Sequence, residues 1–207
     1  MLTRIDLKRE LKPLFHATRV PGWLNVPALN HLTVTGSGGP SGDEFPRAVQ
    51  ALYTAAYTLK FTLKQSGTMD YAVMPLEALW WIPGRETFDQ KHPETWHWKL
   101  MMVVPDEISE DMLEEPLQRA QEKKPELAEA LARVRLERFE EGRCAQVLHV
   151  GPYAAQGPVI EALHHFIAAA ELAPGGKHHE IYLSDPRRTA PSRLKTIIRT
   201  GVKGSPH

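Results

Sequence analysis

The chain has 207 residues, with 25 Lys and Arg against 25 Asp and Glu, so it carries no formal net charge. This length suffices for a substantial hydrophobic core. The balanced charge argues against a general nucleic-acid binder, which needs a basic excess to meet phosphates. No apolar run approaches the roughly 20 residues that cross a bilayer, and the N-terminus lacks the apolar core of a signal peptide. We therefore expect a cytoplasmic protein with neither a membrane nor a direct nucleic-acid partner.

The first part of the chain predicts a short helix, a strand and a long helix. Residues 4–16 have amphipathic helical spacing, whereas residues 20–27 contain two prolines and a glycine and are expected to be irregular. The alternation in HLTVTG predicts a strand, and the turn-rich residues 36–44 predict a loop. Apolar residues at helical spacing then predict a helix over residues 45–64.

The middle of the chain predicts two strands and a charged connector. The segments MDYAVMPLEALWWIP and TWHWKLMMVVP are short and rich in aromatic and aliphatic residues, which is typical of strands. Residues 106–134 are dense in charge and predict short helical pieces with a solvated face. Pro116 and Pro125 are expected to divide them.

The last part of the chain predicts a hairpin, a helix and two strands. RLERFEEGRCAQVLHVGPY predicts a hairpin that turns at EEGR, and GPVIEALHHFIAAAEL predicts a helix. APGGK is expected to be a turn, followed by a strand in HHEIYLSDP and a final strand in RLKTIIRTGV.

The order of these elements is repeated. A strand, a Gly/Pro loop, a helix and two further strands are predicted twice, in roughly residues 20–105 and again in roughly residues 135–203. Neither unit has enough apolar surface to be stable alone, so we expect the two to join into one domain. The fold class is then α+β: one curved antiparallel sheet with both helices on one face and a ligand cleft on the other.

Strand parity indicates what lines that cleft. In HHEIYLSD, His179, Ile181 and Leu183 share one face, while His178, Glu180, Tyr182 and Ser184 share the other. If the apolar set packs on the helices, Glu180 and Tyr182 face the cleft. Trp80 and Trp81 point to opposite faces, and the pattern does not decide which of them lines the cleft. Trp96 and Trp98 share a face, and at least one of them is a candidate for its border.

An aromatic and acidic lining suits small organic ligands. Ring faces bind flat or cationic molecules, and a partly buried Glu180 would select positive or hydrogen-bonding ligands or act as a general base. Two alternatives stay open: the tryptophans are ordinary core, and Glu180 pairs on the surface with Arg187 or Arg188.

Other motifs give weaker signals. Cys144 lies in a predicted strand and is expected to be a buried thiol. His164–His165 and His178–His179 are adjacent pairs whose side chains diverge, so no metal site is expected. GSGGPSG lacks the lysine of a P-loop and GxGxxG is absent, so no nucleotide or other cofactor is expected. No nucleophile-elbow motif surrounds Ser184, so Ser184 and Asp185 are expected to form a turn at the end of a strand and not part of a catalytic triad.

FPRAVQALYTAAYTLKF, PLEALWW, WKLMMVVP, EGRCAQVLHVGPY, KHHEIYLSDPRR and LKTIIRTGV together resemble the stand-alone GyrI-like small-molecule-binding proteins, over roughly residues 5–203. The resemblance implies the duplicated fold and a drug-contacting glutamate at Glu180, with Tyr182 beside it. Some members resemble hydrolases that open activated cyclopropanes inside an aromatic cage, which implies Trp80, Trp81, Tyr182, Trp96 and Tyr153 as cage residues. The chain departs from the family pattern at Ala78, where glycine is expected.

Three functions are compatible with these observations. The chain is a xenobiotic-binding protein, a hydrolase of cyclopropane-type electrophiles with Glu180 as its catalytic residue, or a protein-interaction module of the gyrase-inhibitor type without turnover. A transcription regulator is disfavoured, because residues 1–20 leave no room for a helix-turn-helix. The expected state is a monomer or a weak homodimer.

Overall fold

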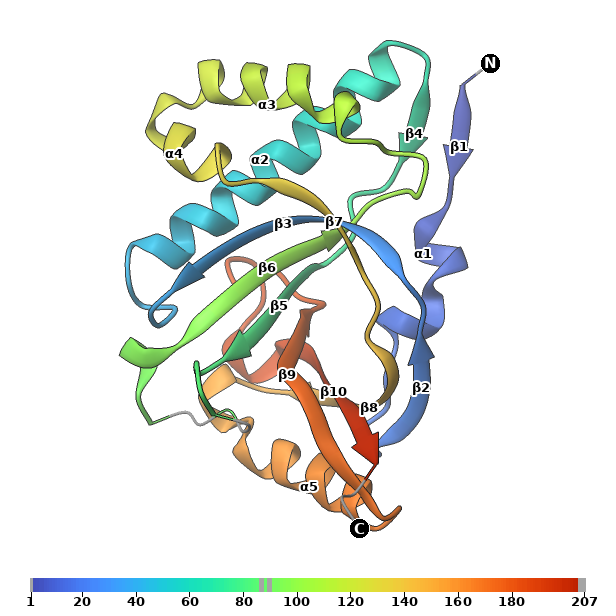
Figure 1. Ribbon diagram of the computed structural model, residues 1–207, viewed down its shortest axis with the longest axis vertical. Coiled ribbons are helices and arrows are strands. Elements are labelled where there is room, and N and C mark those ends of the chain that lie inside the picture. The colour runs from blue at the N-terminus through green and yellow to red at the C-terminus, as the bar shows by residue number, and fades with distance from the viewer. Residues whose placement is uncertain (1, 86–87, 89–90, 205–207) are drawn as a thin grey trace.

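A computed structural model describes residues 2–85, 88 and 91–204 of the chain (Figure 1). Its centre is an eight-stranded sheet with the order β2-β8-β10-β9-β5-β6-β3-β7, in which every neighbouring pair is antiparallel. The strands are β2 (Gly22–Val26), β3 (Leu29–Ser37), β5 (Leu76–Trp81), β6 (His97–Val103), β7 (Arg135–Phe139), β8 (Gly142–Val150), β9 (Leu172–Tyr182) and β10 (Lys195–Gly204). Helices α2 (Glu44–Gln65) and α5 (Gly157–Ala168) pack on the sheet, so the predicted α+β class is confirmed.

The order of the strands confirms the predicted repeat. The succession β3, α2, β5, β6 recurs as β8, α5, β9, β10. In the sheet the two units are arranged symmetrically, as β3-β6-β5 on one side and β8-β10-β9 on the other. Strands β5 and β9 join them, with Leu76 opposite Tyr182 at one end of the pairing and Trp80 opposite His178 at the other. The two units therefore complete one sheet at the β5–β9 junction.

Helix α2 covers the first unit with small and aliphatic side chains. Alanines such as Ala48 and Ala55 alternate with Leu52 and Leu59 along its buried side. This composition lets the helix lie close to the strands, where it forms the main core. The smaller helix α5 covers the second unit through Leu163 and Ile167, which pack with Ala145, Val147 and Ile198.

The two helices lie on the same face of the sheet. Ala78, Glu180, Ile198 and Val147 stand opposite one another across β5, β9, β10 and β8, so their side chains share a face. Ala78 belongs to the core beneath α2, and both Val147 and Ile198 belong to the core beneath α5. Glu180 and Tyr182 are therefore on the helix-covered face, at the junction of the two units. The predicted parity is right, but the predicted orientation of these two residues, away from the helices, is wrong.

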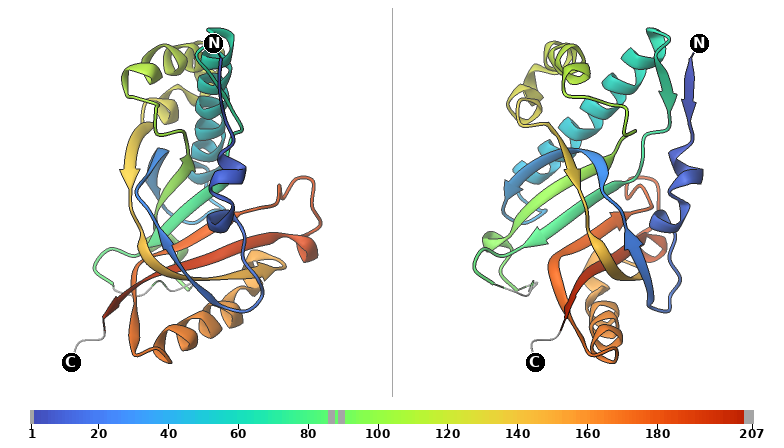
Figure 2. Two further views of the ribbon diagram at one scale, coloured as in Figure 1. Left: turned by 90° about the vertical axis from the view of Figure 1, so that its right-hand side faces the viewer. Right: turned by 45° about the vertical axis from the view of Figure 1, so that its right-hand side comes forward.

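The predicted hairpin of residues 135–153 is also wrong. Strands β7 and β8 do not pair with each other: β7 pairs with β3, whereas β8 pairs with β2 and β10. The chain turns at Gly142, the first residue of β8, whose φ of 69° is unfavourable for residues with a side chain. The two strands thus run alongside the β2–β3 segment and help to curl the sheet (Figure 2).

Four local predictions need correction. Residues 4–16 do not form one helix, because β1 (Thr3–Ile5) precedes α1 (Leu7–Glu10) and a 3-10 helix (Lys12–Phe15) in which Pro13 occupies the first turn. Residues 22–26 form β2 rather than an irregular segment, and residues 173–177 belong to β9. Pro116 is buried inside α3 (Asp111–Lys123) and does not divide it.

The remaining elements surround α2. Strand β1 pairs in parallel with β4 (Met69–Tyr71), and α3 packs on α2 together with α4 (Ala128–Leu131) (Figure 2). Short 3-10 helices complete the chain at Pro93–Thr95, Pro125–Leu127, Tyr153–Ala155 and Pro191–Arg193. Among the described residues, no helix has the length and apolar character needed to span a membrane.

Gly36 of β3 allows Trp98 of β6 to fill the core. A Cβ atom at Gly36 would lie 2.3 Å from the Trp98 ring, and Trp98 is fully buried. The ring meets Phe45 edge-on with centroids 5.3 Å apart. Trp98 is therefore a core residue whose position depends on the missing side chain at Gly36.

Candidate functional site

Trp80 is the centre of a group of rings at the β5–β9 junction, called here the aromatic cluster. It consists of Phe45, Trp80, Phe88, Trp96 and Tyr182. The Trp80 ring stacks on Phe45 at 5.0 Å and meets Trp96 edge-on at 5.6 Å. Its indole N–H donates a hydrogen bond of 3.3 Å to the Tyr182 hydroxyl. The cluster supplies a broad apolar surface with one polar tether.

Glu180 lies beside this cluster and is almost completely buried, with 8% of its surface exposed. Its Oε1 is 3.1 Å from Nε2 of His178, which is on the same face of β9 two residues earlier. Burial and then the neighbouring Glu180 carboxylate raise the pKa of Tyr182 well above its ordinary value. Tyr182 consequently stays protonated and can donate to Glu180 while it accepts from Trp80. Glu180 does not form the surface ion pair considered for it, because it is buried against His178, and Arg187 pairs with Asp185.

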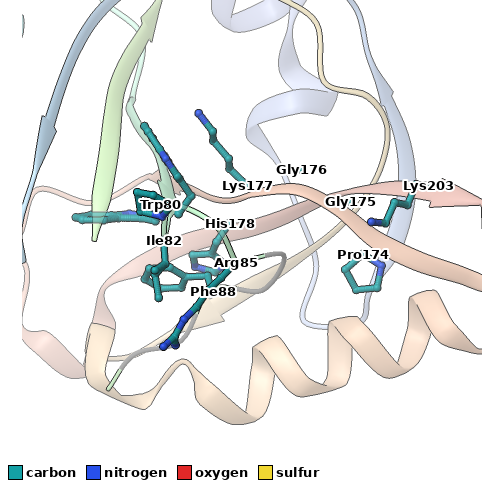
Figure 3. A pocket seen from close by; sticks show the side chains of 13 residues that line it. Trp80, Ile82, Arg85, Phe88, Pro174, Gly175, Gly176, Lys177, His178 and Lys203 are labelled. Carbon is teal, nitrogen blue, oxygen red and sulfur yellow. The ribbon is translucent and has the colours of Figure 1, made fainter. Parts of the chain in front are cut away.

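A cavity of about 380 Å³ opens where β5 leaves β9. Trp80, Trp81, Phe88 and His178 contribute rings to its wall; Ile82, Pro83, Gly84, Arg85, Pro174, Gly175, Gly176, Lys177 and Lys203 complete the lining. Figure 3 shows His178 and Phe88 close together on one side of the cavity, with Pro174 and Lys203 on the other. Glu180 does not line the cavity and is connected to it through His178.

Trp80 and Trp81 both line the cavity, although they point to opposite faces of β5. Both side chains can reach one cavity because β5 ends at Trp81, and the cavity extends around that end of the strand. The Lys177 ammonium lies 3.4 Å from the centre of the Trp81 ring, a close cation–π contact. Burial, followed by the charge of Lys99, lowers the pKa of Lys177.

Three other predicted site residues, Tyr182, Trp96 and Tyr153, do not line the cavity. Trp96 supports the cluster, with its ring 4.8 Å from that of Phe88, but it does not line the cavity. Tyr153 is 37% exposed and meets Tyr182 edge-on, with ring centroids 5.7 Å apart. Trp96 is thus a member of the aromatic cluster, Tyr153 contacts the cluster through Tyr182, and neither residue lines the cavity.

Sequence reasoning missed His178, Phe88 and Lys177 as site residues. The alternation that put Glu180 and Tyr182 on one face also put His178 there, so the signal for His178 was present. Phe88 stacks on the His178 ring at 5.2 Å with 4° between the planes. It lies between β5 and β6 in the chain, and no local pattern predicts that contact.

The opposite face of β9 carries a second buried group of charges, called here the charged cluster: Glu77, Glu141, His179 and Arg199. His179 lies between two carboxylates, with Nε2 3.0 Å from Glu77 and Nδ1 2.9 Å from Glu141. Burial opposes the charged imidazole, but these carboxylates outweigh it and raise the pKa of His179 to about 9. Arg199 lies 3.6 Å from Glu141 and also bonds to Gln146 and to the Leu14 carbonyl. The charged cluster thus joins β5, β9, β10 and the N-terminal segment.

Neither the aromatic cluster nor the charged cluster has the arrangement of a metal site. Over residues 2–85, 88 and 91–204 no three His, Cys, Asp or Glu side chains are arranged to bind a metal ion. His178 and His179 point to opposite faces of β9, as strand geometry requires. The Cys144 thiol is fully buried, and burial followed by the charge of Glu141 raises its pKa to about 12. It is the inert thiol that its place in a strand predicted.

A curved sheet with a ring-lined cavity at the junction of two similar units defines a small-molecule-binding protein. Residues 24–203 match the model of the GyrI-like small molecule binding domain. The chain belongs to the GyrI-like family, as the resemblance of its sequence segments had implied.

Solved structures from Listeria innocua agree with this assignment. An uncharacterized conserved protein is 40% identical, with a TM-score of 0.88 over 96% of this chain and 100% of that one. A hydrolase is 39% identical, with a TM-score of 0.86 over 97% of this chain and 100% of that one. The C-terminal domain of EcmrR shares the fold alone, at 9% identity and a TM-score of 0.54 over 89% of this chain and 97% of that one. No curated protein matches the chain.

Proposed function

We propose that the protein binds flat aromatic xenobiotics in the cavity beside the aromatic cluster, and that it hydrolyses those that carry an activated cyclopropane or a similar electrophile. The observation that carries the proposal is a cavity of about 380 Å³ whose wall contains His178, which pairs with the buried Glu180 behind it, and three further rings. That volume is at the lower end of the range of small-molecule sites. The similarity to a hydrolase from Listeria innocua supports the second half of the proposal.

The residues present are sufficient for such a hydrolysis. Addition of water to a cyclopropane conjugated with a carbonyl group needs a base for the water proton and a site that holds the flat electrophile. Trp80, Trp81 and Phe88 supply the holding surface, and the His178–Glu180 pair supplies the base. No oxidant or reductant is required, because the net change is the addition of one water molecule.

The charge of the wall favours neutral ligands over cations. Among the described residues that line the cavity, Arg85, Lys177 and Lys203 are basic and none is acidic. Of these, the Lys177 ammonium, which lies over the Trp81 ring, can stabilise the negative charge that develops on a carbonyl oxygen when the ring opens. We therefore place uncharged, carbonyl-bearing aromatic compounds ahead of cationic drugs as substrates in the cytoplasm.

The test is turnover of a cyclopropane conjugated with a dienone, whose opening to a phenol changes its absorbance. We expect the wild-type protein to accelerate this change, with a product heavier by one water. Glu180→Gln should react at nearly the rate of buffer, and the exposed change Arg138→Gln should leave the rate unaltered. Wild-type protein that binds the compound but does not accelerate its opening would limit the function to sequestration. The absence of both effects would overturn the proposal.

A further inference from the structure

We infer that His178, rather than Glu180, accepts the proton of the attacking water, and that Glu180 is a positioning residue that acts through it. This inference rests on the proposed function and assigns the roles within the site. It goes beyond the pattern in the sequence, which pointed to Glu180 alone as the catalytic residue.

The first argument is access. His178 lines the cavity, whereas Glu180 is separated from it by the His178 ring. A base must lie within hydrogen-bond reach of the proton that it removes. Of this pair, only His178 meets that condition for a water molecule inside the cavity.

The second argument is preorganisation of the ring. The imidazole is fixed on one side by its 3.1 Å contact with Glu180 and across its plane by Phe88, which is stacked at 5.2 Å. His178 itself is buried, with 8% of its surface exposed. A ring held both at its edge and across its face loses little further freedom in the reaction.

The third argument is the tautomer. An ionised carboxylate can only accept hydrogen bonds, so Nε2 of His178 carries the proton that faces Glu180. The neutral ring then has its lone pair on Nδ1, which becomes the proton acceptor. Tyr182, tethered by the Trp80 indole, also contacts Glu180 and helps to orient the carboxylate. A carboxylate behind a histidine also stabilises the imidazolium once it forms.

The step balances with water as the sole co-reactant. The water oxygen forms a bond to a cyclopropane carbon while its proton passes to Nδ1 of His178. The carbon–carbon bond of the ring breaks, and its electron pair moves through the conjugated system to the carbonyl oxygen. The imidazolium later returns the proton, directly or through solvent, to that oxygen. The product is a ring-opened alcohol, and His178 is regenerated.

The test compares His178 variants with Glu180→Gln on the dienone cyclopropane. We expect His178→Gln and His178→Gly to lower kcat by roughly 10²- to 10⁴-fold, the usual contribution of a general base. The Kd of the compound, followed by tryptophan fluorescence, should stay within about threefold. Added imidazole should restore part of the rate of His178→Gly and none of the rate of Glu180→Gln. His165→Gln, an exposed change on α5, is the matched control.

The outcomes separate the two proposals. If the wild type turns over the compound and His178→Gln keeps its kcat, the inference is wrong while the proposed function stands. A loss of affinity as large as the loss of kcat, or absence of imidazole rescue, also overturns it, because the ring then only shapes the site. His178→Phe preserves a ring against Phe88 and should stay folded yet inactive. If the wild type itself shows no turnover, the proposed hydrolysis fails and this assignment fails with it.

Discussion

Ala78 of β5 stands directly opposite Glu180 of β9, so a single methyl group neighbours the buried carboxylate across the junction of the two units. Ala78 is completely buried in the core beneath α2. A larger residue at this point would have to displace either the helix above it or the side chains of β9. The pairing therefore limits what residue 78 can be.

Ala78→Val should destabilise the protein. Two added methyl groups at a fully packed position cost about 1–3 kcal/mol in the free energy of unfolding. The measurement is urea unfolding, with the exposed change Ala132→Val as the matched control. An unfolding midpoint of Ala78→Val equal to that of the control would show that the junction has unfilled space.

Gly36→Ala should be more disruptive than another Gly→Ala change in the same sheet. The new Cβ atom would meet the buried Trp98 ring at 2.3 Å, so that the ring or the strand must shift. We expect a loss of about 1–3 kcal/mol in the free energy of unfolding. Gly22 of β2 is the control, since a Cβ atom there meets nothing within 4 Å. Equal effects of the two substitutions would contradict the close packing of Trp98 on β3.

Trp80→Phe should weaken ligand binding. The substitution keeps a ring but removes the indole N–H that tethers Tyr182 and reduces the surface beside the cavity. A loss of about 1 kcal/mol corresponds to a several-fold increase in Kd. Trp23→Phe is the control, because Trp23 packs on Phe166 of α5 and does not line the cavity. Fluorescence titration of both variants checks this, and an unchanged Kd for Trp80→Phe would remove Trp80 from the binding surface.

The charged cluster predicts how stability varies with pH. The pKa of His179 is raised from 6.5 to about 9, so its contribution to folding is complete below about pH 6.5 and lost as the pH rises through about 9. The pKa values of Glu77 and Glu141 are lowered because the hydrogen bonds and charges of their neighbours outweigh burial, which alone would raise them. The contribution of these two carboxylates to folding stability is lost as the pH falls from about 4.5, their ordinary pKa, through their lowered pKa values.

Burial lowers the pKa of His31, so its contribution too decreases at acid pH. We therefore expect the greatest thermal stability near pH 6.5, with a decline on both sides. His179→Gln should flatten the decline between about pH 6.5 and 9, and the exposed His165→Gln should not. A melting temperature of the wild type that is constant over that range would contradict the prediction.

Much of the fold was predictable because it depends on local patterns. The helical spacing from Phe45 to Leu63 predicted α2 within one residue at either end, and the repeated order of elements predicted both units. The pairing of β7 and β8 was not predictable, because EEGR has the composition of a turn while the bend at Gly142 leads to a different partner strand. Phe88 could not be assigned to the site, since it lies outside the periodic segments from which strands and helices are predicted.

The sequence by itself determined that His178, Glu180 and Tyr182 share one face of their strand, because side chains alternate with a period of two whatever surrounds them. Only the tertiary structure decided which face that is. The apolar residue Ile181 suggested that its own face packs on the helices, but that face is buried within the curled sheet together with His179, Glu77 and Glu141. Polar residues can be buried there because distant strands supply opposite charges. Those partners, like the ring of Phe88 over His178, are brought together by the fold, and no single strand contains them.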